Sequence, residues 1–180
     1  MLFGLTLAVA AGGGTMCLFA AAVTSRADED APNAITLPQV SKNAGYTTLA
    51  NGKVFHFAED TQDRSWSEPV WGRAPSGMDH LASVDPATTN ELSERGRGRI
   101  YEYPDVPDNA YRDGQIAQKT IEDLRRLKSS QELFFLACGF NRPHMPFYAP
   151  KKYWDTYERD DITLADNRFR PKNAPKALRR

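Results

Sequence analysis

The sequence has few cysteines, few histidines and no net charge. Two cysteines among 180 residues are too few for a disulfide framework or for a zinc site built from cysteines. Lys and Arg together number 23, as do Asp and Glu, so no overall basic field favours nucleic acid as a partner. With 41% hydrophobic and 26% charged residues, the composition excludes collagen-like and low-complexity classes. The length favours one domain.

The N-terminal segment is apolar. Residues 1–23 contain no charged side chain, and small residues follow, so we interpret residues 1–27 as a signal-peptide-like segment. No basic residue precedes the run and residues 12–14 are all glycine, so an uncleaved membrane anchor and a misplaced chain start stay open as alternatives. Cleavage predicts an exported protein, periplasmic, extracellular or lysosome-like, without stable membrane association.

The next part of the chain predicts a helix followed by a strand. The pattern Thr36-Leu37-Pro38-Gln39 is typical of a capping box, and the helix that it starts should end at Gly45 in a left-handed conformation. Residues 46–50 are partly β-branched and predict a short strand that ends at Asn51-Gly52. Residues 58–108 are rich in turn-forming residues without a clear period, and we expect a long surface excursion there.

A second helix and strand follow that excursion. Asp113 is the predicted N-cap of a helix over residues 114–128. Residues 133–138 form a continuous apolar run that predicts a strand buried on both faces, with Cys138 as a buried, inert thiol. The order helix-strand, helix-strand predicts an α/β domain with a mostly parallel sheet. The apolar stripe of the helix comprises Ile116, Ala117, Ile121, Leu124 and Leu127.

Three basic side chains follow the two predicted strands. Lys53 and His56 come after the first strand, and His144 lies between two prolines after the second. Parallel sheets bind ligands beyond the carboxyl ends of their strands, so these side chains are candidates for an oxyanion site in which histidine can also donate a proton. The alternative is structural, since a lysine after a strand is often only solvated and a histidine in a turn often caps or lies on the surface.

Other candidates are interpreted as structural. His80 lies in the irregular region and is not assigned a role in chemistry. Several aromatic side chains could stack on sugar rings, but packing over loops is their more common use. They are Trp66, Trp71, Tyr148, Tyr153, Trp154 and Tyr157.

The motifs from residue 35 onward resemble the sulfatase family, nearest to its iduronate-2-sulfatase-like members. The resemblance rests on Ile35–Gln39, Gly52–His56, Ser65–Ser67 and Arg142–Phe147, in that order and spacing. It implies that residues 28–180 are part of a sulfatase catalytic domain, with the alkaline-phosphatase-like α/β fold of a mostly parallel sheet flanked by helices.

The resemblance also implies hydrolysis of sulfate esters, with sulfated carbohydrate as the expected substrate. In that family a cysteine-derived formylglycine attacks sulfur, a calcium ion and nearby cations hold the sulfate, and a histidine helps the alcohol leave. By position, Lys53 and His56 resemble the pair beside the nucleophile, and His144 resembles the histidine that contacts sulfate. A lysine ammonium there would offset the charge that builds on the sulfate oxygens.

The sequence departs from the family at its nucleophile and its metal site. Cys17 lacks the Pro and Arg of the Cys-x-Pro-x-Arg motif, and Cys138 is followed by Phe140 where Pro belongs. The calcium ligands are not found in the chain, and neither Asp28-Glu29-Asp30 nor Asp79-His80 is a good substitute. We therefore expect a central fragment that is inactive alone. The alternatives are a non-catalytic anion or sulfated-glycan binder, a decayed fragment without function, and a phosphodiesterase on the same fold.

Overall fold

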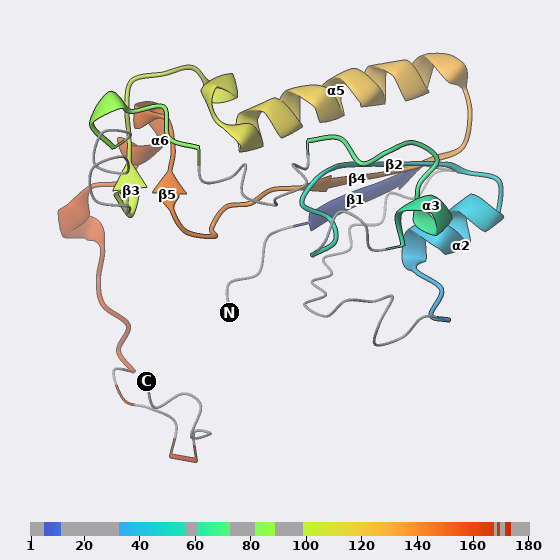
Figure 1. Ribbon diagram of the computed structural model, residues 1–180. Helices are drawn as coiled ribbons and strands as arrows, with labels where there is room; N and C mark the ends of the chain where they lie inside the picture. Colours follow the sequence, from blue (N-terminus) through green and yellow to red (C-terminus); the bar gives the residue numbers. More distant parts are fainter. Residues whose placement is uncertain are drawn as a thin grey trace.

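The computed structural model describes residues 6–11, 33–56, 61–72, 82–88, 99–167, 169 and 172–173. Figure 1 shows the long helix α5 on one side of a sheet and the short helices α2 and α3 on the other, while β3, β5 and α6 group beside it. In chain order the elements are β1 (Thr6–Ala11), α2 (Leu37–Asn43), β2 (Thr47–Gly52), α3 (Gln62–Ser65), β3 (Tyr101–Glu102), η2 (Asp108–Ala110), α5 (Arg112–Ser130), β4 (Phe134–Gly139), β5 (Phe147–Tyr148), α6 (Lys151–Trp154) and η3 (Arg159–Asp161).

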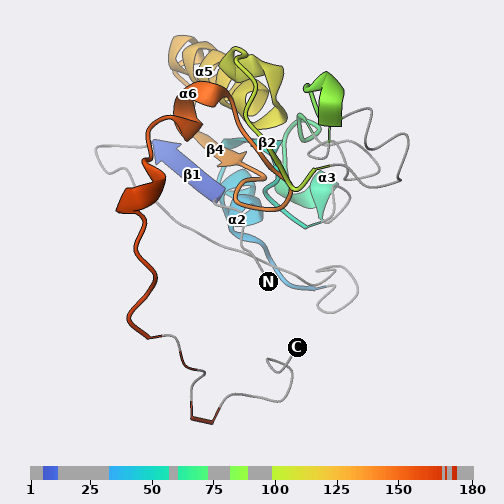
Figure 2. The ribbon, with the colours of Figure 1, turned by 90° about the vertical axis from the view of Figure 1, so that its left-hand side faces the viewer.

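The main sheet has three strands in the order β1-β4-β2. Strands β2 and β4 are parallel, with Gly52 opposite Gly139 at their carboxyl ends. Strand β1 runs antiparallel to β4 on its other side. A second sheet pairs β3 with β5 in parallel. The parallel pair flanked by helices, seen from a second side in Figure 2, confirms the predicted α/β class.

Strand β1 belongs to the segment that the sequence predicts to be signal-peptide-like. It comprises residues 6–11, and the remainder of that segment, residues 1–5 and 12–27, lies outside the described residues. The leader interpretation therefore stays a prediction. No helix in the described part of the chain combines the length and the apolar composition that crossing a membrane requires.

The central strands are buried on both faces, as the apolar run of β4 predicts. On one face Leu49 and Leu136 pack against Leu127 of α5. On the other face Phe135 packs in a cluster with Trp66, whose ring centroid lies 6.2 Å from that of Phe135. Alternate residues of each strand thus serve opposite layers, which fixes the register of the sheet.

Helix α2 begins at Leu37 and is capped by Thr36, as the sequence predicts, and Gly45 adopts a φ of +85° just beyond its end. The Thr36 hydroxyl accepts a hydrogen bond of 3.2 Å from the Gln39 amide. The return half of the predicted capping box is wrong, because the buried Oε1 of Gln39 has no hydrogen-bond partner among the described residues. The hydroxyl of Thr36 instead lies 2.8 Å from that of Ser65, which joins α2 to α3.

Helix α5 differs from its prediction at two points. It begins at Arg112 with Tyr111 at the N-cap, so Asp113 is not the cap and its carboxylate binds a distant loop instead. Ile121 is 48% exposed, whereas Asp123 is 3% exposed and takes a place on the buried face. The predicted apolar stripe is therefore interrupted by a polar group that is held in a hydrogen-bond network.

The predicted surface excursion contains ordered structure that covers the free edge of β2. The Ser67 amide donates to Thr48 at 2.8 Å, and the Trp71 amide donates to Ala50 at 3.0 Å. Short elements α3 and β3 also lie in this stretch. Parts of residues 58–108, including His80, lie outside the described residues.

Candidate functional site

The carboxyl ends of β2 and β4 meet in direct backbone contact. The Lys53 amide donates a hydrogen bond of 2.8 Å to the Gly139 carbonyl. A Cβ added to Gly139 would lie 2.0 Å from the Lys53 carbonyl oxygen, and one added to Gly52 would lie 2.2 Å from the Gly139 oxygen. Gly52 also has a φ of +76°, which favours glycine. The loops that follow both strands therefore start from one point at this edge of the sheet.

The loop after β2 carries Lys53 and His56. Between them, Val54 and Phe55 pack against the buried cluster around Trp66, with the Phe55 and Trp66 ring centroids 5.5 Å apart. This apolar pair anchors the loop. Lys53 is half-buried and His56 is exposed on either side of it.

The loop after β4 carries His144 and is held by a carboxylate from α5. Asp113 accepts hydrogen bonds from the backbone amides of Asn141 at 2.9 Å and Arg142 at 3.0 Å. The Asn141 side chain is buried and donates to the same carboxylate at 3.4 Å. Asp113 therefore fixes the first turn of this loop to the first turn of α5.

Arg142 ties the far end of the same loop. Its Nε donates to the Tyr148 carbonyl at 3.1 Å, and its Nη1 donates to the His144 carbonyl at 3.3 Å. The guanidinium carbon lies 5.7 Å from the centroid of the Tyr148 ring. Burial lowers the pKa of Arg142 and nearby Asp113 opposes that shift, but an arginine stays charged in proteins. The loop is thus closed by a half-buried cation.

The His144 ring has a defined tautomer. Its Nδ1 lies 2.6 Å from the Met145 carbonyl oxygen, and since a carbonyl can only accept, Nδ1 carries a proton. The other ring nitrogen, Nε2, is then the atom that gains or loses a proton. The backbone amide of His144 donates to Asn141 at 2.8 Å, which closes the turn. An imidazole held in this way can donate from Nε2 only in its cationic form.

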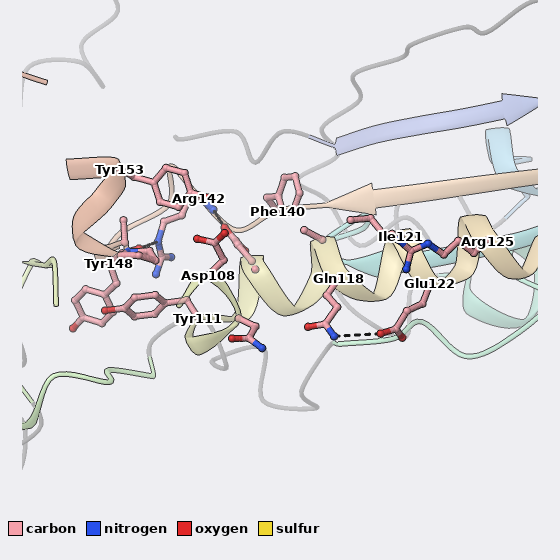
Figure 3. A pocket seen from close by; sticks show the side chains of 16 residues that line it. Asp108, Tyr111, Gln118, Ile121, Glu122, Arg125, Phe140, Arg142, Tyr148 and Tyr153 are labelled. Carbon is pink, nitrogen blue, oxygen red and sulfur yellow. Dashed lines mark hydrogen bonds between the residues drawn. The ribbon is translucent and has the colours of Figure 1, made fainter. Parts of the chain in front are cut away.

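A cavity of about 750 Å³ lies between α5, η2 and α6, on one flank of this loop. Phe140 and Arg142 contribute to its wall, together with Ile121 and Tyr153 (Figure 3). The exposed Ile121, which the sequence predicts to be part of the apolar stripe of α5, therefore lines a cavity.

The structure starts the loops that carry the predicted site residues at one edge of the sheet. The backbones of Lys53 and Gly139 are in contact, and His144 lies in the loop that leaves Gly139. The convergence of the side-chain tips of Lys53, His56 and His144 stays a prediction. Cys138 is 6% exposed, and burial raises the pKa of its thiol, so its prediction as a buried residue is confirmed.

The described residues do not fit a calcium site. Among them, no group of three or more His, Cys, Asp or Glu side chains is placed to hold a metal ion. The acidic segments at residues 28–30 and 79–80 lie outside the described part of the chain. We therefore derive no chemical step through a metal from these residues.

Sequence reasoning missed the polar residues that hold the site in place. Asp123 is buried and accepts hydrogen bonds from Lys119 and, at 2.9 Å, from Asn51 at the end of β2. Burial alone would raise the pKa of Asp123, but the bonds from Lys119 and Asn51 and the charge of Arg126 lower it below its ordinary value. The sequence signal that could have revealed this role is an acidic residue at a helical position that faces the sheet.

Comparisons with known proteins find relatives over most of the chain. The model of the sulfatase family matches residues 9–176. The chain is 32% identical to iduronate 2-sulfatase of Mus musculus over 155 residues (79% of this chain, 26% of the relative) and 32% identical to that of Homo sapiens over 162 residues (81% and 27%). It is 31% identical to a sulfatase of Formosa agariphila over 140 residues (75% and 27%). The chain spans about a quarter of the length of these curated relatives.

Proposed function

Because this chain belongs to the sulfatase family, we propose that it supplies part of the sulfate-binding edge of a sulfuric-ester hydrolase. Lys53, His56 and His144 are the residues that act on the sulfate group. The supporting observation is the backbone junction between Lys53 and Gly139, because it starts both loops at the carboxyl ends of adjacent parallel strands, where open α/β sheets bind ligands.

Each of the three residues has a role that follows from its chemistry. The ammonium of Lys53 stabilises negative charge on the sulfate oxygens as the ester S–O bond breaks. His144 donates from Nε2 to a sulfate oxygen while it is an imidazolium, because its Nδ1 proton is bound to the Met145 carbonyl. His56 is exposed and can bring a proton to the leaving alcohol.

The nucleophile is not assigned to any residue of this chain. The sequence contains no Cys-x-Pro-x-Arg motif, and its free Cys138 is buried in β4. We therefore propose that the 180-residue chain alone does not hydrolyse sulfate esters. In the relatives whose names specify a substrate, that substrate is an iduronate sulfate. A sulfated carbohydrate is accordingly the proposed substrate class.

Turnover of a chromogenic sulfate ester tests the proposed inactivity. We expect the purified chain with calcium to release no alcohol from 4-nitrophenyl sulfate, because it lacks the nucleophile. Turnover that His144→Ala abolishes would overturn this proposal. Calorimetry with a sulfated oligosaccharide then addresses the alternative of a non-catalytic binder. Heat of binding that requires Lys53, at oligosaccharide concentrations far below the sulfate concentration needed to protect this lysine, would favour that alternative.

Protection of Lys53 by sulfate tests the location of the site. Acetylation of individual lysines is followed by mass spectrometry in concentrated sodium sulfate and in sodium chloride of equal ionic strength. Sulfate is expected to slow the acetylation of Lys53 but not that of Lys128, a matched exposed lysine at the end of α5. His144→Ala is expected to reduce the protection. Equal rates in both salts would contradict the assignment.

Export is proposed on the apolar composition of residues 1–27. Cleavage at the end of this segment would remove β1 and expose the outer edge of β4. N-terminal sequencing of the protein secreted by expressing cells tests the proposal. A mature chain that begins with Met1 and stays inside the cell would contradict it.

A further inference from the structure

Three aromatic side chains form an exposed stack beside the second sheet. Tyr101 and Tyr103 come from the β3 segment, and Trp154 comes from α6. The Tyr103 and Trp154 ring centroids are 4.5 Å apart with an angle of 15° between the planes, and Tyr101 lies 5.6 Å from Trp154 at 19°. The three residues remain 51%, 43% and 45% exposed in sequence order. Exposed apolar surface gathered in this way is typical of a binding site.

The stack is held in place by the backbone on both sides. The Lys151 amide at the start of α6 donates to the Pro104 carbonyl at 2.9 Å, and the Ala149 amide donates to the Glu102 carbonyl at 3.2 Å. Between the two tyrosines, the buried carboxylate of Glu102 accepts hydrogen bonds of 2.6 Å from both Ser83 and Tyr111. The rings therefore sit on a preorganised support, which reduces the entropy lost when a ligand binds.

A cavity of about 630 Å³ adjoins the tyrosines, and the charges that line it determine which ligands it favours. Its wall includes Tyr101, Tyr103, Arg99, Asp85 and Glu102. Arg99 lies 3.9 Å from Asp85, so these two charges offset each other, and the buried Glu102 leaves the wall with an acidic surplus. A sulfate or carboxylate is disfavoured there, whereas sugar hydroxyls can donate to Asp85 and accept from Arg99.

We propose that this stack and cavity form a subsite for an uncharged pyranose ring. The C–H face of the sugar lies on the Tyr101 and Tyr103 rings that line the cavity, with Trp154 stacked against these rings as their support, and its hydroxyls bind Asp85 and Arg99. The inference rests on the proposed function and deepens it, because it assigns a neighbouring sugar of a sulfated carbohydrate chain. Strand β5 links the two sites: Phe147 pairs with Tyr101, and only Met145 and Pro146 separate Phe147 from His144.

Binding of unsulfated tetrasaccharides to the whole chain tests the proposal. Cellotetraose and chitotetraose are titrated and followed by calorimetry and ligand-observed NMR. At least one of them is expected to bind, and Trp154→Ala or Tyr103→Ala is expected to weaken its affinity about tenfold, the loss typical of removing an aromatic anchor. Tyr157→Ala is the matched control, since Tyr157 is 73% exposed and lies close to Trp154 in the sequence. The affinity of this variant for the tetrasaccharide should stay unchanged.

The outcomes separate this proposal from the proposed function. His144→Ala is expected to reduce the sulfate protection of Lys53 while keeping affinity for the neutral sugar, and Lys53→Ala is likewise expected to keep that affinity. The subsite is refuted if neither tetrasaccharide binds, or if Trp154→Ala binds as well as the unaltered chain. It is also refuted if the chain dimerises through the stack, shown by sedimentation in which Trp154→Ala alone becomes monomeric. Circular dichroism of each variant verifies that the fold is kept.

Discussion

Replacing Asp113 by alanine should release the loop that carries His144. The carboxylate accepts from the amides of Asn141 and Arg142 at 2.9 and 3.0 Å, and Asn141 is 4% exposed. Each partly buried donor that loses a charged acceptor costs about 1–3 kcal/mol, and water reaches the Arg142 amide more easily than that of Asn141. The two losses together predict a fall of about 2–4 kcal/mol in the free energy of unfolding.

The assay combines urea unfolding with hydrogen exchange. Unfolding followed by circular dichroism gives the free energy, and exchange measured by NMR reports the amides of Asn141 and Arg142 individually. Asp113→Asn keeps one acceptor oxygen and should lose about half as much stability as Asp113→Ala. Glu122→Ala is the control, because Glu122 lies exposed on the same helix with a hydrogen bond of 3.4 Å to Gln118. Its effect should stay within about 0.5 kcal/mol.

A specific result would refute the reasoning about the loop. If Asp113→Ala changes the free energy of unfolding no more than Glu122→Ala does, the carboxylate does not hold the loop. The same conclusion follows if the Asn141 and Arg142 amides keep their protection from exchange in the variant. Loss of stability without faster exchange at these amides would place the effect in α5 and not in the loop.

Three further predictions concern the buried polar network and the strand ends. Folding lowers the pKa of Asp123, so this residue contributes to stability above pH 3.8, its ordinary pKa, and the contribution is lost as the pH falls through the lowered pKa. In Asp123→Asn the free energy of unfolding should therefore fall less steeply as the pH is lowered through this range. Gly139→Ala should lower the free energy of unfolding measured in urea by about 1–3 kcal/mol, since its Cβ would lie 2.0 Å from the Lys53 carbonyl oxygen. An unchanged urea midpoint would contradict that contact. Cys138 should react with iodoacetamide only after unfolding, as mapped by mass spectrometry, because burial raises its pKa; rapid alkylation of the native chain would show an accessible thiol.

The elements that the sequence predicts well are those determined by neighbouring residues. Thr36 caps its own helix, and Gly45 ends it two residues beyond the last helical position, so a short window contains the whole signal. Strand β4 is likewise recognisable from its apolar run, because a strand covered on both faces needs no polar alternation. The junction of Lys53 with Gly139 follows from a general rule on parallel strands, which requires no knowledge of the side chains.

The residues that sequence reasoning misplaced depend on contacts far along the chain. Asp123 has a place on the buried face because its partner Asn51 lies on β2, and the residues near position 123 do not identify this partner. Ile121 is the complementary case, since its spacing fits the predicted apolar stripe while its side chain is exposed and lines a cavity. The tips of the three candidate site residues pose the same difficulty, because their meeting depends on loop conformations.

The position of Asp113 explains why the start of α5 departs from its local signal. An aspartate near a helix N-terminus favours the cap, but here the carboxylate accepts from the loop after β4 and lies in the first turn of the helix, where the dipole stabilises its charge. The preceding η2 turn supports the helix start instead: Gln115 donates from its side chain to the Asn109 carbonyl at 3.0 Å, and a Cβ on Gly114 would lie 1.8 Å from the Asp108 oxygen. Because η2 stabilises the helix end, the carboxylate is available to fix the loop that carries His144. The helix start and the candidate site are therefore coupled.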